Sequence, residues 1–378
     1  MQRFLIFTSF LFLFIATSTT QAIPTPAPPS IAGSGHLLID FHSGHIISQE
    51  NANQRLEPAS ITKLMTAYVV FTELAQGNLN LNDEVLISEK AWKTPGSRMF
   101  VEVGKKVKLE DLLKGMIIQS GNDASVALAE HVAGSESVFA SVMNTQAQRL
   151  GMLDTNFENA TGLPSPNHYT TAEDIAKMSM ATIREFPEYY KWYSVKSFTF
   201  NKIKQPNRNA LLWRDDAVDG MKTGHTEAAG YCLVSSAKKD NMRLISVVLG
   251  TKSKKDREKE SQKLLNYGFR FFETHKLYSA GESLSKTKVW KGISDQLAVG
   301  LAEDLFITIP RNQYKNLNAD ISLNLPLLAP VNKSQAIGKL NIDLAGNIVT
   351  QKPLIALEDI AEAGFVGSII DSVMMMFE

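Results

Sequence analysis

The chain has 378 residues, with 39 lysines and arginines against 39 aspartates and glutamates, so its formal net charge is zero. A chain of this length exceeds what one hydrophobic core usually organises, and we therefore expect a large domain joined to a smaller one. The balanced charge leaves no overall field that would attract a polyanion. Nucleic acid is therefore not expected among its partners.

The first 22 residues have the pattern of a cleavable signal peptide. Arg3 supplies the positive start, residues 4–16 form a largely apolar run, and Thr20-Gln21-Ala22 offers a small-residue cleavage site. About thirteen apolar residues are too few to cross a bilayer easily, which disfavours the alternative of an uncleaved anchor. The pattern predicts an exported protein. Residues 23–34 are rich in proline and should form an extended leader.

The large domain is predicted over residues 35–285. Residues 35–48 have the pattern of a hairpin around the turn His42-Ser43-Gly44 and should supply two edge strands. Apolar residues at helical spacing predict the helices that follow. These cover residues 59–79, 109–118, 124–132 and 171–183, and a strand pair over 230–250 precedes a last helix over 258–274. Strands, then helices, then strands again are typical of an α+β fold.

From about residue 286 the pattern changes to short β-rich runs separated by turn residues, such as 305–309, 319–325 and 339–344. We predict a small all-β domain over residues 286–357. Residues 358–378 remain, and from Phe365 on they are predicted to form an amphipathic helix. The residues expected on its apolar side are Phe365, Val366, Ile369, Ile370, Val373, Met376 and Phe377, with Met375 as an exception on the polar side.

Cys232 is the only cysteine, which excludes an intramolecular disulfide. It lies in the apolar run Tyr231-Cys232-Leu233-Val234. We therefore predict a small core residue, with a catalytic thiol as the alternative.

Ser60-Ile61-Thr62-Lys63 places a hydroxyl and an amine three residues apart at a helix start, so both side chains project from one face. A serine hydroxyl is a poor nucleophile until a base takes its proton, and an amine kept neutral by burial and nearby cations can be that base. The pattern alone is weak, because Ser-x-x-Lys also begins at Ser235, Ser236, Ser283 and Ser285.

Two further motifs raise the specificity of the first. Ser120-Gly121-Asn122 falls between two predicted helices, and Lys222-Thr223-Gly224, which occurs once, enters a predicted strand. The three motifs in this order are the signature of penicillin-binding proteins and serine β-lactamases.

The sequence resembles the low-molecular-mass penicillin-binding proteins, specifically the D-alanyl-D-alanine carboxypeptidases of the penicillin-binding protein 5 type in serine peptidase family S11. The resemblance implies a β-lactamase/transpeptidase-like catalytic domain, with an antiparallel sheet and a helical cluster, followed by a small all-β domain and a C-terminal amphipathic helix. It runs from about Gly35 to the C-terminus. The matching segments are Glu57-Pro58-Ala59, residues 120–124, Asn207-Arg208-Asn209, residues 219–226 and residues 268–272.

The resemblance also implies the chemistry. Ser60 would attack the carbonyl between the two terminal D-alanines of a peptidoglycan pentapeptide, form an acyl-enzyme and release one D-alanine. Lys63 would be the base, and Ser120 would relay a proton to the leaving amine. β-Lactam antibiotics are expected to bind and inhibit the same serine.

The substrate would be held by residues of the second and third motifs. Asn122 would bond the substrate amide and Lys63, while Lys222 and Thr223 would hold the terminal carboxylate. The resemblance implies an oxyanion hole from the backbone N–H groups of Ser60 and His225.

The sequence also contains two arginines that could either contact the substrate or support the structure. Arg257 falls where the family carries an arginine near the carboxylate site, and a planar guanidinium suits a carboxylate, yet a solvated arginine at a helix start fits equally well. Arg208 is predicted to be a structural partner rather than a ligand contact.

Neither a cofactor nor a metal ion is expected. The sequence has no His-Glu-x-x-His motif and no Gly-x-Ser-x-Gly nucleophile elbow. A β-lactamase is an alternative, but no Glu-x-x-Leu-Asn loop lies between Asn122 and Lys222. A non-enzymatic cell-wall scaffold is a second alternative, and a transpeptidase remains open because water and an amine compete for one acyl-enzyme.

The C-terminal helix is expected to hold the protein on a membrane surface. Fourteen residues rise only about 21 Å as a helix, which is too short to cross about 30 Å of hydrocarbon. The segment should therefore lie in the interface. The expected location is the periplasm, peripheral on the outer face of the cytoplasmic membrane. Packing on its own β-domain and a dimer contact are the alternatives.

Overall fold

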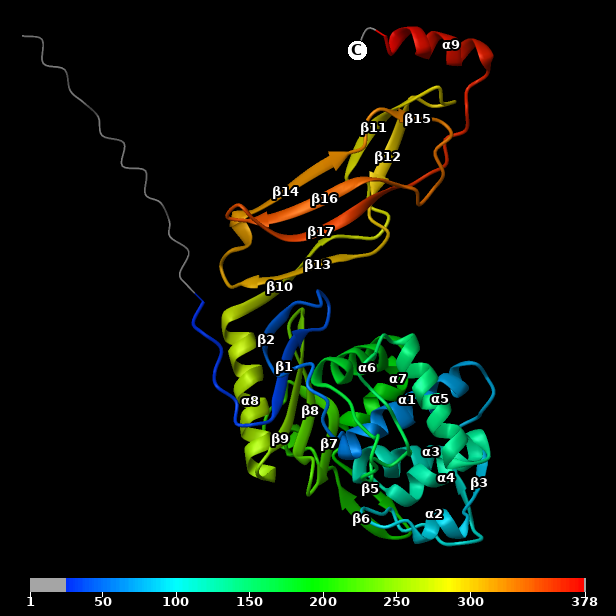
Figure 1. The fold of residues 1–378 in the computed structure, drawn as a ribbon, viewed down its shortest axis with the longest axis vertical. Helices are drawn as coiled ribbons and strands as arrows, with labels where there is room; N and C mark the ends of the chain where they lie inside the picture. The colour runs from blue at the N-terminus through cyan, green and yellow to red at the C-terminus, as the bar shows by residue number, and fades with distance from the viewer. Residues whose placement is uncertain (1–24, 377–378) are drawn as a thin grey trace, which may run out of the picture.

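The computed structural model describes residues 25–376, so the expected signal peptide and Phe377 lie outside the described residues. A globular part carries an elongated β-rich part above it, and helix α9 (Phe365–Met374) lies at the far end of the latter (Figure 1). The two predicted parts are therefore present, and the C-terminal helix lies far from the globular part.

A five-stranded antiparallel sheet, in the order β2-β1-β9-β8-β7, forms the centre of the globular part. Its strands are β1 (Gly35–Asp40), β2 (Ile46–Glu50), β7 (Val218–Thr226), β8 (Gly230–Lys239) and β9 (Met242–Thr251). Only β2 of the predicted hairpin is an edge strand, so the prediction of two edge strands was wrong for β1. The consecutive residues Leu37 and Leu38 of β1 are both 0% exposed, since both faces of the sheet are covered.

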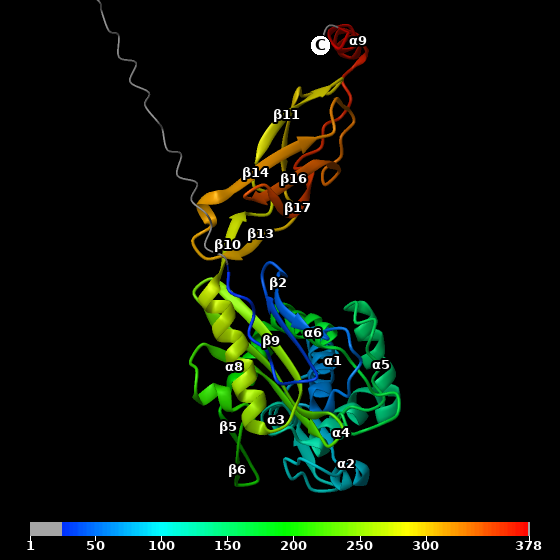
Figure 2. The same ribbon diagram turned by 60° about the vertical axis from the view of Figure 1, so that its left-hand side comes forward.

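Helices cover the two faces of this sheet (Figure 2). On one face, Leu38 of β1 and Leu233 of β8 pack with Leu264 of α8 (Lys254–Phe271). On the other, Leu37 and Val234 belong to the core of the helical cluster. That cluster contains α1 (Lys63–Ala75), α2 (Glu89–Lys93), α3 (Leu109–Lys114), α4 (Asn122–Ala133), α5 (Glu136–Arg149), α6 (Ala172–Glu185) and α7 (Pro187–Tyr190).

The last helix of the globular part differs from its prediction at both ends. α8 begins at Lys254 because the Ser253 hydroxyl accepts a hydrogen bond from the Asp256 N–H at 3.1 Å and so caps it. It ends at Phe271, and the chain continues as strand β10 (Phe272–Tyr278). Thr274, the predicted last helical residue, therefore belongs to a strand.

The β-rich part begins at β10, earlier than the expected boundary near Lys286. β10 pairs with β13 (Leu305–Pro310), and a six-stranded sheet lies beyond them. In sheet order these strands are β14 (Leu317–Leu323), β16 (Ala336–Leu344), β17 (Asn347–Ala356), β12 (Gln296–Gly300), β11 (Ser285–Trp290) and β15 (Leu327–Leu328). Two short hairpins, β3 (Glu84–Leu86) with β4 (Lys106–Lys108) and β5 (Ser197–Phe200) with β6 (Ile203–Pro206), belong to the globular part.

Polar contacts join the two parts. The Asp40 carboxylate at the end of β1 accepts a hydrogen bond from the Thr274 hydroxyl of β10 at 2.8 Å. The Ser43 hydroxyl lies 2.6 Å from that of Thr308 in β13, and His42 stacks on Phe306 with ring centroids 4.7 Å apart. These contacts fix the β-rich part on the edge of the central sheet.

α9 presents apolar side chains to solvent and ends earlier than predicted, at Met374. Phe365 is 82% exposed, and Ile369, Ile370 and Val373 are about half exposed. The helix is attached to the β-rich part through its polar side, where the Asp371 carboxylate accepts the backbone N–H of Lys291. Among the described residues, no helix has the length and apolar character needed to span a bilayer.

Candidate active site

Ser60 and Lys63 lie at the start of α1, on the side of the helix that faces the sheet. A 3₁₀ turn, Ala59–Thr62, carries Ser60 and leads directly into α1, whose first residue is Lys63. Lys63 is 1% exposed. Its Nζ donates hydrogen bonds to the Ser60 hydroxyl at 2.9 Å and to the Thr161 carbonyl at 2.5 Å. The amine is thus aimed at the hydroxyl and held from behind.

Burial changes the charge state of this amine. The pKa of Lys63 is lowered to about 7, first because the side chain is removed from water and second because of the Arg208 guanidinium, while the Asp123 carboxylate opposes the shift. Close to neutral pH, a large fraction of Lys63 is therefore uncharged and can accept a proton.

The turn that carries Ser60 is closely packed on its neighbours. Ala59 adopts a left-handed conformation, with φ of 46°. A Cβ atom on Gly162 would lie 1.8 Å from the Ala59 carbonyl oxygen, and one on Gly224 would lie 3.0 Å from the Pro58 carbonyl oxygen. Position 162 therefore has no room for a side chain, and position 224 is tight because its backbone lies close to this turn.

The loop that contains Thr161 is itself held by side chains. The Asn159 amide oxygen accepts the N–H groups of Thr161 and Gly162 at 3.1 and 2.7 Å. The His168 ring accepts the Glu158 N–H at Nδ1, so its Nε2–H donates to the Thr62 hydroxyl at 2.8 Å. Burial lowers the pKa of His168 to about 4, so the ring is neutral near pH 7 and joins this loop to the turn of Ser60.

Ser120 comes to the site from the end of a π-helical turn, Gly115–Gln119, which extends α3. Its backbone is left-handed, with φ of 69°. The nearby Asp123 carboxylate accepts the backbone N–H groups of Met99 and Phe100 at 3.0 and 2.9 Å and so joins this segment to the loop that contains Met99. Ser120 is 2% exposed, and its hydroxyl accepts a hydrogen bond from the Lys222 ammonium at 2.9 Å.

Asn122 leaves one polar atom unused. Its Nδ2 donates to the Pro95 carbonyl at 2.6 Å. Its Oδ1 is buried and has no hydrogen-bond partner among the described residues. A buried acceptor without a partner is costly, so this oxygen is suited to accept an N–H from a bound molecule.

Lys222 is 2% exposed and points from β7 toward Ser120 rather than into open space. Its Nζ also donates to the Thr223 carbonyl at 3.1 Å. Burial, followed by the charges of Lys63, Arg208 and Arg257, holds the pKa of Lys222 well below its usual value. The motif residue therefore contacts the second serine directly.

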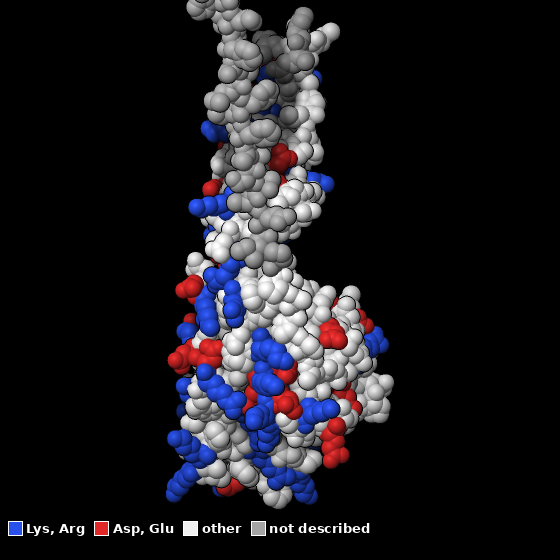
Figure 3. All heavy atoms as spheres, turned by 90° about the vertical axis from the view of Figure 1, so that its left-hand side faces the viewer, with Lys and Arg blue, Asp and Glu red and all other residues white. Residues whose placement is uncertain are grey.

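A cavity of about 270 Å³ opens over these groups. We call it the Ser60 cavity, and it is lined by Ser60, Ser97, Ser120, Arg208, Thr223, Gly224, His225, Tyr231, Lys254 and Arg257. Three of these are cations, and the described lining residues include no aspartate or glutamate. Figure 3 shows that lysine and arginine also gather on the outer surface of the globular part, on the side where α8 lies. The cavity is therefore suited to an anion.

The wall opposite Ser60 is built by β7, β8 and the start of α8. The exposed His225 ring stacks on Tyr231 with centroids 3.9 Å apart, and the two residues are paired in register. Arg257 donates from one terminal nitrogen to the Gly224 carbonyl at 3.2 Å, while its buried Nε has no partner among the described residues. Arg257 is 5% exposed, so it is not the solvated helix-start arginine of the alternative.

Sequence reasoning missed several of these groups. Ser97, Tyr231 and Lys254 line the Ser60 cavity without having been predicted. Arg208 was expected to be structural, and its Nε does donate to the Gln119 carbonyl at 2.9 Å, but it also lines the cavity. The strand pairing of His225 with Tyr231 was the one available signal, because cross-strand partners share a face.

Cys232 is 0% exposed, and burial raises the pKa of its thiol to about 11, which confirms a core residue. Within residues 25–376, no group of histidine, cysteine and acidic side chains is arranged to hold a metal ion.

This arrangement of a serine, a buried lysine and a second serine–lysine pair beside an antiparallel sheet defines a serine acyl-transfer site. Residues 22–253 match the family described as D-alanyl-D-alanine carboxypeptidase, and residues 272–362 match the C-terminal domain of penicillin-binding protein 5. The chain belongs to the D-alanyl-D-alanine carboxypeptidase family, which confirms the resemblance seen in the sequence.

Individual relatives agree with this assignment. The chain is 45% identical to D-alanyl-D-alanine carboxypeptidase DacC of Escherichia coli over 98% of its own length and 94% of that protein. The structure of penicillin binding protein 5 from Haemophilus influenzae is 45% identical with a TM-score of 0.87, covering 89% of this chain and 100% of that one. Penicillin-binding protein D2 from Listeria monocytogenes, in its ampicillin-bound form, is 28% identical with a TM-score of 0.57 over 65% of this chain and 100% of that one. These likenesses confirm the predicted fold class.

Proposed function

We propose that the protein is a serine-type D-alanyl-D-alanine carboxypeptidase that removes the terminal D-alanine from peptidoglycan pentapeptides through an acyl-enzyme on Ser60. The observation that carries the proposal is the Lys63 amine, 2.9 Å from the Ser60 hydroxyl, with its pKa lowered to about 7. A base of this pKa removes the serine proton at neutral pH.

Acylation proceeds by proton transfer and bond exchange among these groups. Ser60 Oγ attacks the carbonyl between the two D-alanines while Lys63 Nζ takes its proton. The negative oxygen of the tetrahedral intermediate is stabilised by the backbone N–H groups of Ser60 and His225. The C–N bond then breaks, and the proton taken up by Lys63 passes through Ser120, which Lys222 orients, to the leaving amine. Water next attacks the ester carbonyl while Lys63 accepts its proton. The bond between the carbonyl carbon and Ser60 Oγ then breaks as Lys63 returns this proton to Ser60 Oγ, and the shortened peptide leaves.

The Ser60 cavity receives the departing D-alanine and its carboxylate. We propose that Thr223 and Arg257 contact this carboxylate directly and that the buried Lys222, which donates a hydrogen bond to the Ser120 hydroxyl, orients Ser120. Asn122 Oδ1, which has no partner among the described residues, accepts the N–H of the substrate amide on the other side of the scissile bond. The same groups would hold a β-lactam antibiotic, which acylates Ser60 and inhibits the enzyme.

Arg257→Ala should lower kcat/KM for substrates that end in a carboxylate far more than for neutral substrates. Its guanidinium lines the cavity, and a charged hydrogen bond contributes roughly a ten- to hundred-fold effect. We expect a loss of this size in kcat/KM for peptides ending in D-Ala-D-Ala and a much smaller loss for the corresponding D-alaninamide. Equal losses on the two substrates would assign Arg257 to the structure of the β7–α8 wall instead.

Release of D-alanine from a pentapeptide, measured alongside the lifetime of the penicilloyl adduct, tests the function against its alternatives. A carboxypeptidase releases D-alanine and keeps the penicilloyl adduct for a long time. A β-lactamase would turn over penicillin rapidly, a scaffold would form no adduct, and a transpeptidase would transfer the acyl group to an added amine in preference to water.

We further propose that α9 holds the exported protein on the outer face of the cytoplasmic membrane. The apolar side chains of the helix are exposed rather than packed on the β-rich part: Phe365 is 82% and Ile370 54% exposed. A helix with one apolar side and this length lies in the interface with its apolar side in the acyl region. Within the described residues no cation lies on α9 itself, so binding depends on apolar burial.

Removing α9 should release the protein from membranes. The truncation should end at Gly364, because Ile360 is 4% exposed in the core of the β-rich part and pairs with Val331. We expect the full chain to sediment with membranes and the truncated chain to be soluble, with equal penicillin labelling in both. Membrane binding that survived the truncation, in protein with its signal peptide removed, would exclude α9 as the anchor, and a loss of dimer rather than of membrane binding would identify a dimer contact.

A further inference from the structure

A second cavity is lined by residues whose carbonyl groups hold Lys63 and Asn122. Thr161 and Pro95 line this cavity of about 370 Å³, which we call the Lys93 cavity. Their carbonyl oxygens accept hydrogen bonds from Lys63 Nζ at 2.5 Å and from Asn122 Nδ2 at 2.6 Å. Lys63 Nζ also donates to Ser60 Oγ, which lines the Ser60 cavity. The amine is therefore bonded to a lining residue of each cavity, and the two cavities share no lining residue.

The walls of the Lys93 cavity combine apolar and charged groups. Pro95, Val126 and Leu163 supply an apolar surface, while Lys90, Lys93 and Glu136 supply charge. An apolar wall with a charged end is suited to a flexible aliphatic chain that carries a charged group.

Only some of these charges are available to a ligand. Glu136 is occupied, since it accepts from Lys90 Nζ at 2.8 Å and from the Ala160 N–H at 3.1 Å, and its side chain is 13% exposed. Lys93 instead pairs with Glu89 at 2.5 Å in an exposed ion pair, in which the two side chains are 63% and 68% exposed. Exposed pairs of this kind contribute little and exchange readily. Lys93 can therefore exchange Glu89 for the anionic group of a ligand.

We propose that the Lys93 cavity binds the acyl side of the substrate, specifically an aliphatic side chain that ends in a carboxylate. The inference depends on the proposed function, because the acyl group must be attached at Ser60. With the departing D-alanine in the Ser60 cavity, the rest of the peptide leaves from the opposite side of the scissile bond. It passes Asn122 Oδ1, the buried acceptor without a partner among the described residues. Its side-chain methylene groups then contact Pro95 and Leu163, and its carboxylate meets Lys93.

Two pentapeptides that differ by one carboxylate test the proposal. Both end in D-Ala-D-Ala, and their third residue is lysine in one and diaminopimelate, which is lysine with an added carboxylate on its terminal carbon, in the other. We expect the unaltered protein to prefer diaminopimelate about two- to five-fold in kcat/KM, the size of one exposed charged contact. Lys93→Ala should remove most of this preference, and Lys93→Glu should reverse it, which a merely structural role could not do.

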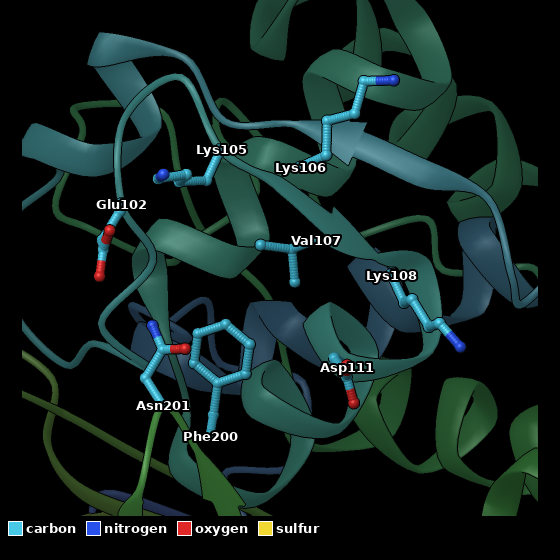
Figure 4. A pocket seen from close by; sticks show the side chains of 8 residues that line it. All are labelled: Glu102, Lys105, Lys106, Val107, Lys108, Asp111, Phe200 and Asn201. Atoms are coloured by element: carbon cyan, nitrogen blue, oxygen red, sulfur yellow. The ribbon is translucent and has the colours of Figure 1, made fainter.

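A lysine in another cavity provides the matched control. Figure 4 shows a cavity of about 390 Å³ between β4 and the turn of the β5–β6 hairpin, lined by Lys105, Glu102 and Phe200 among others. Lys105 is exposed, so Lys105→Ala changes the charge equally and should leave the preference as it is. Equal hydrolysis of both peptides by the unaltered protein, or a preference that survives Lys93→Glu in a variant of unchanged melting temperature, would overturn the proposal. Failure of the proposed function looks different, because neither peptide would then release D-alanine, and both ideas would fall.

Discussion

Ser60→Ala should abolish penicillin labelling and reduce D-alanine release by at least about a thousand-fold, the typical cost of removing a nucleophile. Among five Ser-x-x-Lys segments, Ser60 is the one whose hydroxyl lies beside a buried lysine of lowered pKa. Ser60 is only partly buried at the edge of its cavity, so loss of one oxygen should leave the fold intact. Intact-mass spectrometry after incubation with penicillin gives the measurement.

The sequence itself offers the matched control. Ser283 begins another Ser-x-x-Lys segment and is exposed in the β-rich part, so Ser283→Ala should label and turn over as the unaltered protein does. A stable penicilloyl adduct on a folded Ser60→Ala variant would place the nucleophile elsewhere.

The rate of acylation should fall about tenfold for each pH unit below about 7. The pKa of Lys63 is lowered to about 7, and only the neutral amine can take the serine proton. Above this pKa the amine is mostly neutral and the rate is constant, and as the pH falls through the pKa the reactive fraction is lost. Lys63→Arg should be nearly inactive at every pH, because a guanidinium stays protonated. Stopped-flow acylation by a fluorescent penicillin gives the profile.

A substitution at Arg208 tests whether the titration of Lys63 causes the fall in rate at low pH. Its positive charge is the second contribution that lowers the pKa of Lys63, so Arg208→Gln should move the acid limb of the profile to higher pH. Arg214→Gln is a matched control, since Arg214 pairs with Glu258 at 2.6 Å and does not line the Ser60 cavity. An active Lys63→Arg variant, or a limb that stays in place in Arg208→Gln, would assign the limb to another group.

The sequence predicts which residues form the active site, but it does not predict the hydrogen bonds that fix their side chains. The first two motifs lie where helices begin or end, and such positions are marked by short polar signals in the sequence, while Lys222-Thr223-Gly224 lies within β7. The contact that fixes Lys63 from behind comes from the Thr161 carbonyl, and a backbone oxygen has no sequence signature. The same is true of the Pro95 carbonyl that holds Asn122.

The predicted start of the helix over residues 171–183, which was based on apolar spacing, coincides with a capping residue. Thr171 caps α6 at the predicted start, because its hydroxyl accepts the Asp174 N–H at 3.1 Å. The equivalent signal at Ser253, followed three residues later by Asp256, was present but was not used, and α8 was therefore predicted to begin too late. α5 was missed because its buried residues are few and its remaining surface is polar.

The close approach of Gly162 to Ala59 limits how this enzyme can evolve away from its inhibitors. A methyl group at position 162 has no room beneath the serine turn, and one at position 224 would be in tight contact with the Pro58 carbonyl oxygen. We call these two glycines the floor of the site and expect side chains introduced there, above all at position 162, to reduce folding or activity. The rim is more permissive, since His225 is exposed and supports its neighbours by ring stacking. Selection for β-lactam resistance in this protein should collect substitutions at the rim, around His225 and Lys254, and leave the floor unchanged.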